Sequence, residues 1–363
     1  MIKERDNKET GRIAVLLFNL GGPDGPDAVQ PFLFNLFFDP AIISLPLPLR
    51  WAIAKLISTR RAPFARENYA LMGGGSPLLP ETLRQARALE AELSGRGQTV
   101  RAWPVMRYWH PFAPEVAAEV KAWAPDRIIA LPLYPQFSTS TSASSLKDWD
   151  RAARKAGLRV PTSTVCCWPV EPGLVEAHAS LIVERWHQAE AEAPGRPMRI
   201  LLSAHGLPKK IIERGDPYQW QVEQSCAAVM DRVAAMLGRP LETIDWQVCY
   251  QSRVGPLEWI GPSTDAEVER AGRDGCGLIL VPIAFVSEHV ETLVELDVEY
   301  RHLAEKSGVT PYLRAPTPTT HPAFIRGLGD LVMQAAGREG VAPDRAGPSC
   351  PAKFGRCACR AHT

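Results

Sequence analysis

Short apolar stretches alternate with longer amphipathic ones along most of the chain. Amphipathic stripes with helical spacing predict helices over 79–95, 174–191, 221–237 and 265–272. The apolar stretches predict seven buried strands, at 13–20, 100–106, 127–134, 159–165, 199–204, 244–250 and 278–285. Because strands that alternate with helices form parallel sheets covered on both faces, this pattern predicts an α/β fold.

A weak internal repeat divides the pattern into two similar halves. ALPLYPQFST at 130–139 aligns with LVPIAFVSEH at 280–289, and each half opens with an apolar strand that runs into a small-residue turn. Two such α/β domains commonly enclose a site between them. We therefore expect a polar tail, two domains, a C-terminal helix and a cysteine-containing extension, at 1–12, 13–168, 169–318, 319–338 and 339–363.

The segment GLILVPIAFVSEHVETLVELDVEY, at 277–300, begins as a buried strand and continues as a helix that carries acids. At ~100° of rotation per residue, four of its glutamates fall on one narrow stripe. The ordinary interpretation of such a stripe is a solvated face. However, this helix starts where a buried strand ends, which is where open α/β sheets bind ligands. Carboxylates there, beside an imidazole, could pass a divalent cation or relay protons. The stripe consists of Glu288, Glu291, Glu295 and Glu299, and the imidazole is His289.

A second histidine follows the predicted strand at 199–204 directly. His205, in LLSAHGLP, is expected at the same sheet edge as His289 and Glu291. A lone histidine is more often structural than catalytic. Its position at the mouth of a strand favours function, because an imidazole with an ordinary pKa of about 6.5 suits a proton acceptor near neutral pH.

Composition narrows the possible functions. The 363 residues include 41 Lys and Arg against 40 Asp and Glu, so a net charge of +1 gives no reason to expect nucleic-acid binding. The first residues, MIKERDNKETGR, lack the apolar core of a secretory signal. No run of ~18 apolar residues predicts a membrane-spanning helix. We therefore expect a cytoplasmic protein.

One apolar segment qualifies that expectation. Residues 32–61 are rich in Leu, Phe and Ile, are broken by prolines, and end in Arg60 and Arg61. The segment could rest on a membrane surface with these arginines at the headgroups. The alternative is an ordinary core helix and loop.

Eight motifs, in order between about residues 13 and 335, resemble the ferrochelatase family. The resemblance implies the chelatase fold, with two Rossmann-like domains and a porphyrin in the cleft between them. It implies insertion of Fe²⁺ into protoporphyrin IX to form protohaem, with release of two protons. The motifs are NLGGP, GGGSP, RYWHPF, LYPQFSTSTSASS, SAHGLP, RGDPY, YQSRVGPLEWIGP and VPIAFVSEHVETLVELDVEY.

The resemblance also implies roles for the matching residues. His205 matches the family's essential histidine, which accepts pyrrole protons or delivers the metal, and Glu291 matches its active-site acid. Both are expected to meet the substrate iron. Glu288, His289 and Glu295 match an acidic path for metal or protons. The residues that match the porphyrin pocket are Leu20, Ser76, Arg107, Tyr108, Trp259 and Phe285.

The same resemblance gives the apolar segment at 32–61 a role as the lips of the pocket, which lie on the membrane in relatives that take protoporphyrin from it. Relatives that use coproporphyrin are less apolar there, so the segment favours protoporphyrin IX and peripheral contact with the inner membrane surface. The alternatives are a coproporphyrin chelatase, a chelatase for cobalt or nickel, and a non-catalytic tetrapyrrole carrier built on the same cleft.

Three of the eight cysteines form a C-x₆-C-x-C pattern near the C-terminus: Cys350, Cys357 and Cys359. Three thiols within ten residues indicate a metal centre, although Zn²⁺ also accepts thiolates and a tail of idle thiols is the alternative. Some ferrochelatases carry a [2Fe–2S] cluster on such an extension, so the resemblance implies one here, with a fourth, internal cysteine ligand.

The internal ligand of the animal enzymes falls where this chain has Thr139. We therefore expect the fourth ligand to be Cys166 or Cys167, and the alternation of side chains along a strand predicts that only one of them faces the tail. The remaining cysteines are expected in the core: Cys226, Cys249 and Cys276.

Overall fold

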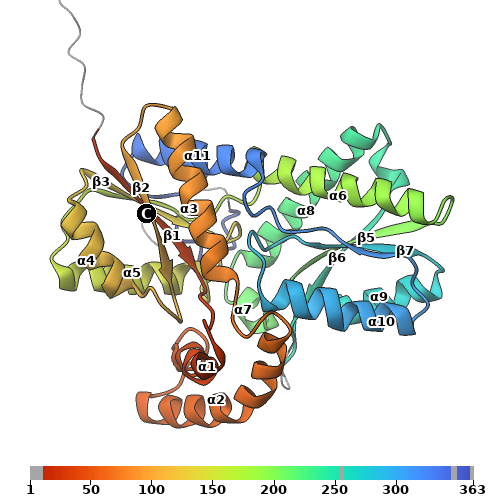
Figure 1. Cartoon of the computed structure of the whole chain (residues 1–363), viewed down its shortest axis with the longest axis horizontal. Helices are drawn as coiled ribbons and strands as arrows, with labels where there is room; N and C mark the ends of the chain where they lie inside the picture. Colours follow the sequence, from red (N-terminus) through yellow and green to blue (C-terminus); the bar gives the residue numbers. More distant parts are fainter. Residues whose placement is uncertain (1–10, 254–256, 345–349, 360–363) are drawn as a thin grey trace, which may run out of the picture.

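Two parallel β-sheets lie side by side in the computed structural model, which describes residues 11–253, 257–344 and 350–359 (Figure 1). The first sheet has the order β2-β1-β3-β4-β9 and the second has the order β6-β5-β7-β8. The predicted α/β fold with two sheets is therefore confirmed. Of the predicted polar tail, residues 1–10 lie outside the described residues.

All seven predicted strands are present. The apolar pattern does not predict β8 and β9, because three residues are too few to show a period. The first sheet consists of β1 (Ile13–Asn19), β2 (Val100–Met106), β3 (Arg127–Pro132), β4 (Thr162–Val165) and β9 (Gly340–Ala342). The second consists of β5 (Met198–His205), β6 (Asp245–Gln251), β7 (Gly277–Pro282) and β8 (Tyr312–Arg314).

The two sheets share one topology up to their fourth strand. β1 pairs with β2 and β3, and β5 pairs in the same way with β6 and β7. β3 spans 127–132 and β7 spans 277–282, so they have the same offset of 150 residues as the repeat in the sequence. The repeat therefore reflects equivalent strands in two similar sheets.

Helices cover both faces of each sheet. In β1, alternate residues face opposite cores: Val15 and Leu17 pack beneath α3 and α11, whereas Leu16 and Phe18 pack beneath α4 and α5. α6 and α8 cover one face of the second sheet, and α9 and α10 cover the other. The helices are α1 (Val29–Phe38), α2 (Leu47–Ala70), α3 (Leu78–Gly95), α4 (Ala113–Trp123), α5 (Ser142–Ala156), α6 (Pro172–Glu192), α7 (Lys209–Glu213), α8 (Tyr218–Leu237), α9 (Thr264–Arg273), α10 (Tyr300–Lys306) and α11 (Pro322–Ala336).

α1 and α2 project from one side of the molecule, below the two sheets in Figure 1. Together with the loop between them they contain the apolar segment 32–61. Much of that segment is exposed, including Leu47 (60%), Leu49 (57%) and Trp51 (53%). In the part of the chain that the structure describes, no helix is long and apolar enough to span a bilayer.

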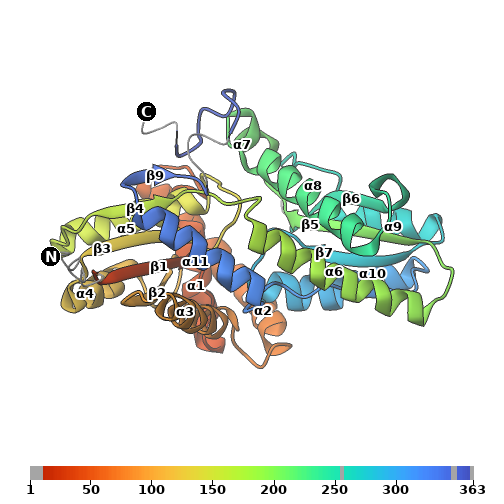
Figure 2. The same cartoon turned by 90° about the horizontal axis from the view of Figure 1, so that it is seen from above.

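The chain returns to the first sheet after completing the second. α11 packs on α3 and on the start of α6, and β9 then extends the first sheet beside β4 (Figure 2). This return brings the C-terminal extension back to residues that precede it by almost 200 positions.

Candidate active site

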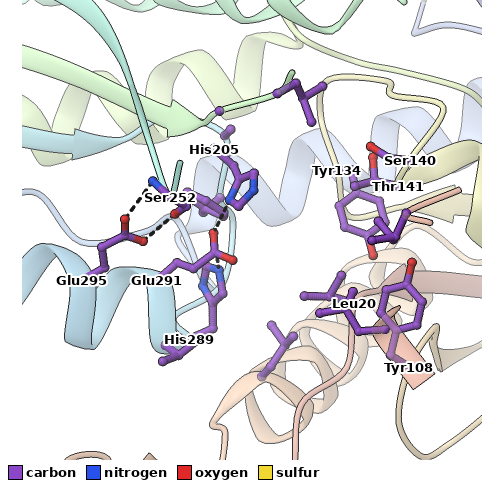
Figure 3. A pocket seen from close by; sticks show the side chains of 18 of the residues that line it. Leu20, Tyr108, Tyr134, Ser140, Thr141, His205, Ser252, His289, Glu291 and Glu295 are labelled. Carbon is purple, nitrogen blue, oxygen red and sulfur yellow. Dashed lines mark hydrogen bonds and ion pairs between the residues drawn. The ribbon is translucent and has the colours of Figure 1, made fainter. Parts of the chain in front are cut away.

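A cavity of about 920 Å³ lies where the carboxyl ends of both sheets meet α1 and α2. Its volume is at the upper end of the range for small-molecule sites. Five of the predicted pocket residues line it: Leu20, Ser76, Tyr108, Trp259 and Phe285. Figure 3 shows two facing groups of side chains. We name them the histidine wall (His205, Ser252, His289, Glu291, Glu295) and the tyrosine wall (Leu20, Tyr108, Tyr134, Ser140, Thr141).

His205 and Glu291 form a hydrogen-bonded pair in the histidine wall. His205 is the last residue of β5, and its Nδ1 lies 2.9 Å from Oε2 of Glu291 (Figure 3). The hydroxyl of Tyr218 donates to the carbonyl of His205 at 3.1 Å and fixes the backbone beside the ring. Because a carboxylate only accepts, Nδ1 carries the hydrogen, and Nε2 remains able to take a proton.

The pair shifts the pKa of both partners. Burial acts to lower the pKa of His205, but the Glu291 carboxylate outweighs it and raises this pKa above its usual value. Burial acts to raise the pKa of Glu291, but His205 and then His289 hold it well below its usual range. Glu291 is therefore ionised, and a proton taken up by His205 is stabilised by the neighbouring charge.

His289 is a second imidazole on the same carboxylate. Its Nε2 lies 3.9 Å from Oε2 of Glu291, and its Nδ1 lies 3.1 Å from the carbonyl oxygen of Ser287. Since a carbonyl only accepts, Nδ1 carries the hydrogen, and Nε2 is the nitrogen that can exchange a proton on the Glu291 side. Phe285 packs against the ring with 4.7 Å between centroids.

Glu295 lies one turn beyond Glu291 and is held by Gln251, the last residue of β6, and by Ser252, which follows it. It accepts hydrogen bonds from the Ser252 amide (2.9 Å), the Ser252 hydroxyl (2.5 Å) and the Gln251 side chain (3.1 Å). Ser252 has a left-handed backbone, with φ of 61°, at this point. Burial and then the charge of Glu291 raise the pKa of Glu295 to about 7. This carboxyl group can therefore bind and release a proton near neutral pH.

The prediction of four glutamates on one helical stripe is wrong for the first of them, Glu288. The helix begins only after a loop, and Glu291–Glu299 form a π-helix, a wider form that is often found at functional sites. Glu288 lies in the loop and does not line the cavity; it bonds Arg314 at 2.9 Å and accepts from the Thr317 amide. Glu299 does line the cavity, so the row of carboxylates there is Glu291, Glu295 and Glu299.

The tyrosine wall is supported from behind by a buried carboxylate that the sequence does not single out. The hydroxyl of Tyr108 donates to Asp39 at 2.9 Å. Arg107 does not line the cavity; its guanidinium donates to Asp39 at 2.7 Å and to Ser144 at 2.9 Å, and it lies 5.0 Å from the centre of the Tyr108 ring. Asp39 lies 68 and 69 positions from these partners, so no local pattern reveals it.

The tail cysteines lie outside this cavity, in a separate apolar cluster with Cys166, Cys167 and Phe137. Sγ of Cys166 lies 3.0 Å from Sγ of Cys359 and 3.6 Å from Sγ of Cys167. Cys167 in turn contacts Cys350. The prediction that only one internal thiol faces the tail is therefore wrong, because β4 ends at Val165 and strand alternation does not extend to the next two residues.

The donor chemistry of this thiol cluster (Cys166, Cys167, Cys350, Cys357, Cys359) suits a soft metal or an iron–sulfur centre. Within residues 11–253, 257–344 and 350–359, no three His, Cys, Asp or Glu side chains are already arranged to hold a metal ion. The other three cysteines lie in the cores of the second sheet, as predicted.

The tail docks on the start of α8. The Arg356 amide donates to the carbonyl of Gly215, and the Gln221 side chain donates to Sγ of Cys350 at 3.1 Å. Rings of Phe354 and Trp220 lie 5.8 Å apart. The extension therefore bridges the end of β4 in the first sheet and a helix of the second, as Figure 2 shows near α7.

Comparison with known proteins finds relatives that match nearly the whole chain. A family model described as ferrochelatase matches residues 12–336. A ferrochelatase of Phenylobacterium zucineum (strain HLK1) is 58% identical over 354 residues, which are 96% of this chain and 98% of that protein. A ferrochelatase of Caulobacter vibrioides (strain NA1000 / CB15N) is 54% identical over 356 residues, 97% of this chain and 98% of that one.

Among solved structures, the sirohydrochlorin chelatase SirB from Bacillus subtilis subspecies spizizenii, in complex with cobalt, has a similar fold. The TM-score is 0.50 at 11% sequence identity, and the match covers 90% of this chain and 96% of that one. At this identity the likeness concerns the fold alone.

Proposed function

This chain belongs to the ferrochelatase family, and from that premise we propose how its cavity performs the reaction. The reaction is the insertion of Fe²⁺ into a porphyrin to form protohaem. It requires a site that binds a flat macrocycle, removes two pyrrole protons and brings a divalent cation to the ring nitrogens. The two walls of the cavity supply these functions separately.

The porphyrin lies between the walls, with the histidine wall facing one side of the ring and the tyrosine wall facing the other. Tyr108 is only 1% exposed and is held by Asp39, so it offers a stiff surface. Rigid walls that fit a bent ring better than a flat one stabilise the transition state, since bending directs the nitrogens toward the metal. Trp259 and Phe285 complete the enclosure.

His205 accepts the pyrrole protons through Nε2. The Glu291 carboxylate orients the imidazole and stabilises its charged form, since it lies 2.9 Å from Nδ1. Glu295, with a pKa of about 7, then takes protons from this pair toward Glu299. His205 and Glu291 also meet the substrate iron, because a carboxylate beside a neutral imidazole binds a divalent cation at modest affinity.

The single observation that carries this proposal is the His205–Glu291 hydrogen bond at the edge of a cavity that is large enough for a macrocycle. We expect His205→Ala to reduce Fe²⁺ insertion by at least about 10³-fold while porphyrin affinity, measured by fluorescence quenching, stays within a few fold. A matched control is His187→Ala, since His187 is exposed on α6. Normal metallation by His205→Ala would contradict the proposal.

The same assay separates an enzyme from a porphyrin carrier. A carrier needs the cavity but not the His205–Glu291 pair. If the protein were a carrier, the wild type would insert no Fe²⁺, and His205→Ala and His187→Ala would both bind porphyrin as the wild type does. Anaerobic assays with protoporphyrin IX and coproporphyrin, and with Fe²⁺ and Co²⁺ in competition, identify the preferred substrates.

We further propose that the thiol cluster holds a [2Fe–2S] centre with Cys350, Cys357, Cys359 and one of the two internal cysteines as ligands. Five buried thiols in one apolar pocket support this proposal, with Sγ atoms as close as 3.0 Å. Such a centre would join the tail to the end of β4. Insertion of Fe²⁺ needs no electron transfer, so the role of the centre lies in structure or sensing.

Anaerobically purified protein should then absorb visible light through sulfur-to-iron charge transfer. Of the variants Cys166→Ser and Cys167→Ser, we expect one to lose this absorption and the other to keep it. Cys226→Ser, in the core of the second sheet, is the control that should keep it. Colourless protein with bound zinc would contradict the proposal.

We also propose that the exposed apolar surface of the loop before α2 and of α2 itself rests on a lipid bilayer. Leu47, Leu49 and Trp51 are each more than half exposed, and Phe64 on the same helix is 59% exposed. Arg61, which lines the cavity, lies on this helix and can reach anionic headgroups. Apolar porphyrin would then enter the cavity from the membrane.

A further inference from the structure

One face of α3 contains two polar residues that are fully buried. Positions 78, 82, 85 and 89 share a face at helical spacing, and Leu78, Thr82, Gln85 and Leu89 are all buried. Thr82 and Gln85 are each 0% exposed. A buried polar group costs free energy unless it is hydrogen-bonded, so the partners of these two side chains show what this face is for.

Gln85 uses its whole carboxamide on two chain segments that follow β7 and β8 of the second sheet. Its Nε2 donates to the carbonyl of Val286 at 2.8 Å and to the carbonyl of Thr319 at 3.1 Å. Its Oε1 accepts from the hydroxyl of Ser287 at 3.1 Å. Both amide hydrogens and the carbonyl oxygen are therefore engaged, and all three partners lie more than 200 positions away.

Two of these partners, Val286 and Ser287, lie just before the histidine-wall residues His289 and Glu291 in the chain. The carbonyl of Ser287 accepts from Nδ1 of His289 at 3.1 Å, and Glu291 begins the π-helix two residues later. On its other side the loop is held within its own half, since Glu288 bonds Arg314. The Gln85 hydrogen bonds thus fix the backbone of this loop relative to α3, while Val286 packs in the core of the first sheet.

Thr82, one turn before Gln85 on the same face, makes the corresponding contact to the tyrosine wall. Its hydroxyl accepts from the side chain of Asn19 at 3.1 Å and donates to the carbonyl of Leu78 at 2.7 Å. Asn19 in turn accepts from the amide of Leu20, and the carbonyl of Leu20 accepts from the amide of Tyr108. One helix face therefore bonds the backbone behind the histidine wall directly and the backbone behind the tyrosine wall through the Asn19 side chain.

We propose that α3 sets the separation of the two walls and that Gln85 is a positioning residue for His289 and Glu291. An α-helix is stiff over one turn, so Thr82 and Gln85 hold their partners at a fixed distance. A porphyrin that bends between two walls requires a fixed distance between them, because misplacing a catalytic group by ~1 Å can lower the rate about 100-fold. The inference rests on the proposed role of the His205–Glu291 pair.

Gln85→Met tests the inference, because methionine keeps the length of the side chain and removes all three hydrogen bonds. We expect kcat for Fe²⁺ insertion to fall about 10- to 100-fold, with KM for porphyrin and metal changed less than about threefold. Resonance Raman bands that report out-of-plane distortion of the bound porphyrin should weaken. A merely structural hydrogen bond would not change these bands.

Gln85→Glu is the conservative variant. When its buried carboxyl group is protonated, it can still donate to Val286 and accept from Ser287, so we expect kcat and the Raman bands between those of Gln85→Met and wild type. Asp330→Asn is the matched control, since it removes the 2.6 Å ion pair with Arg96 at the other end of α3. It should keep the wild-type kcat and spectrum.

Wild-type kcat and Raman bands in Gln85→Met would overturn the inference, and so would a loss that Asp330→Asn reproduces. If Gln85→Met fails to fold, Gln85→Glu and Ser287→Ala decide, and wild-type values in both would overturn it. His205→Ala is assayed in parallel. If that variant is inactive while Gln85→Met is normal, only this inference fails; if His205→Ala is active, the proposed catalytic pair fails.

Discussion

The carboxylates of the histidine wall have different environments although they lie on one helix. Glu291 stays ionised because His205 and His289 are beside it, whereas Glu295 has a pKa of about 7 because it is buried near the charge of Glu291. Near neutral pH, Glu295 can therefore bind and release a proton while Glu291 keeps its charge beside the imidazoles. The sequence places both on one face but does not give this difference, which depends on burial.

The raised pKa of Glu295 predicts a pH-dependent cost in stability. The folded protein holds this proton more tightly than the unfolded chain, so the resulting stabilisation is complete below about pH 4.5 and is lost as the pH rises through about 7. Glu295→Gln lacks this loss. Relative to wild type, its free energy of unfolding should therefore rise by about 1–2 kcal/mol from pH 5 to pH 8, after allowance for solvent in the cavity.

Urea denaturation of both metal-free proteins at the two pH values measures this change. The hydrogen bonds lost from Ser252 and Gln251 lower the stability of the variant equally at both pH values, so they cancel. A constant difference between variant and wild type would show that Glu295 keeps an ordinary pKa.

At the level of elements, sequence patterns predict the regular parts and fail at the functional helix. Seven strands follow from their apolar runs, since helices cover both faces of each sheet. The pattern assumes α-helical rotation through Glu288, but the chain forms a loop there and then a π-helix from Glu291. The π-helix makes tertiary contacts, such as that of Gln251 with Glu295, which the preferences of its own residues do not predict.

The contact between α11 and α6 predicts different outcomes for two glycines on one helix. A Cβ on Gly327 would lie 2.2 Å from Oε2 of Glu171, the carboxylate that caps α6 by accepting from the amide of Leu174. We expect Gly327→Ala to destabilise the protein by about 1–3 kcal/mol. Thermal or chemical unfolding measures this effect.

Gly329→Ala is the control two positions along α11. Its Cβ would meet the movable guanidinium of Arg96 at 3.3 Å, and alanine favours a helix over glycine. Its stability should equal or slightly exceed that of wild type. Equal losses in both variants would mean that the tight approach to Glu171 is not what limits residue 327.

The exposed surface of α2 predicts binding to vesicles. Leu49→Ser with Trp51→Ser should weaken co-sedimentation with liposomes of zwitterionic and anionic phospholipid by at least about tenfold, because each buried apolar side chain contributes about 1.5–3 kcal/mol. Met236→Ser, an exposed apolar position on α8, is the control and should bind normally. Insertion of Fe²⁺ into porphyrin dissolved in detergent should be unchanged, and wild-type vesicle binding by the double variant would exclude this surface.

At the scale of the whole molecule, the C-terminal extension connects elements that are remote in the sequence. β9 adds to the first sheet, and the cysteines behind it meet Cys166, Cys167 and the start of α8. A bound metal centre would therefore stabilise the contact between the two halves, since ligand binding to the folded state adds to its stability.

Removal of that centre should lower the thermal midpoint. We expect an iron chelator with a reductant to bleach the visible absorption and to lower the midpoint of wild type by several degrees. The variant with Cys350, Cys357 and Cys359 all changed to Ser should start at the lower midpoint and should not respond to the chelator. An unchanged wild-type midpoint after bleaching would show that the centre does not hold the tail.

The sequence by itself determined the two parallel sheets, seven of their strands and the residues that gather at one sheet edge. Burial requires apolar residues to recur with the period of the strand or helix that they form. Parallel strands end at a common edge of the sheet, so the sequence alone predicts that His205 and Glu291 lie close together. Only the tertiary structure decided that Glu288 pairs with Arg314, that Arg107 and Tyr108 both bond Asp39, that both Cys166 and Cys167 reach the tail, and that Gln85 bonds the loop before His289. Each of these is a polar or sulfur contact between segments far apart in the chain, and a local pattern of residues contains no information about such partners.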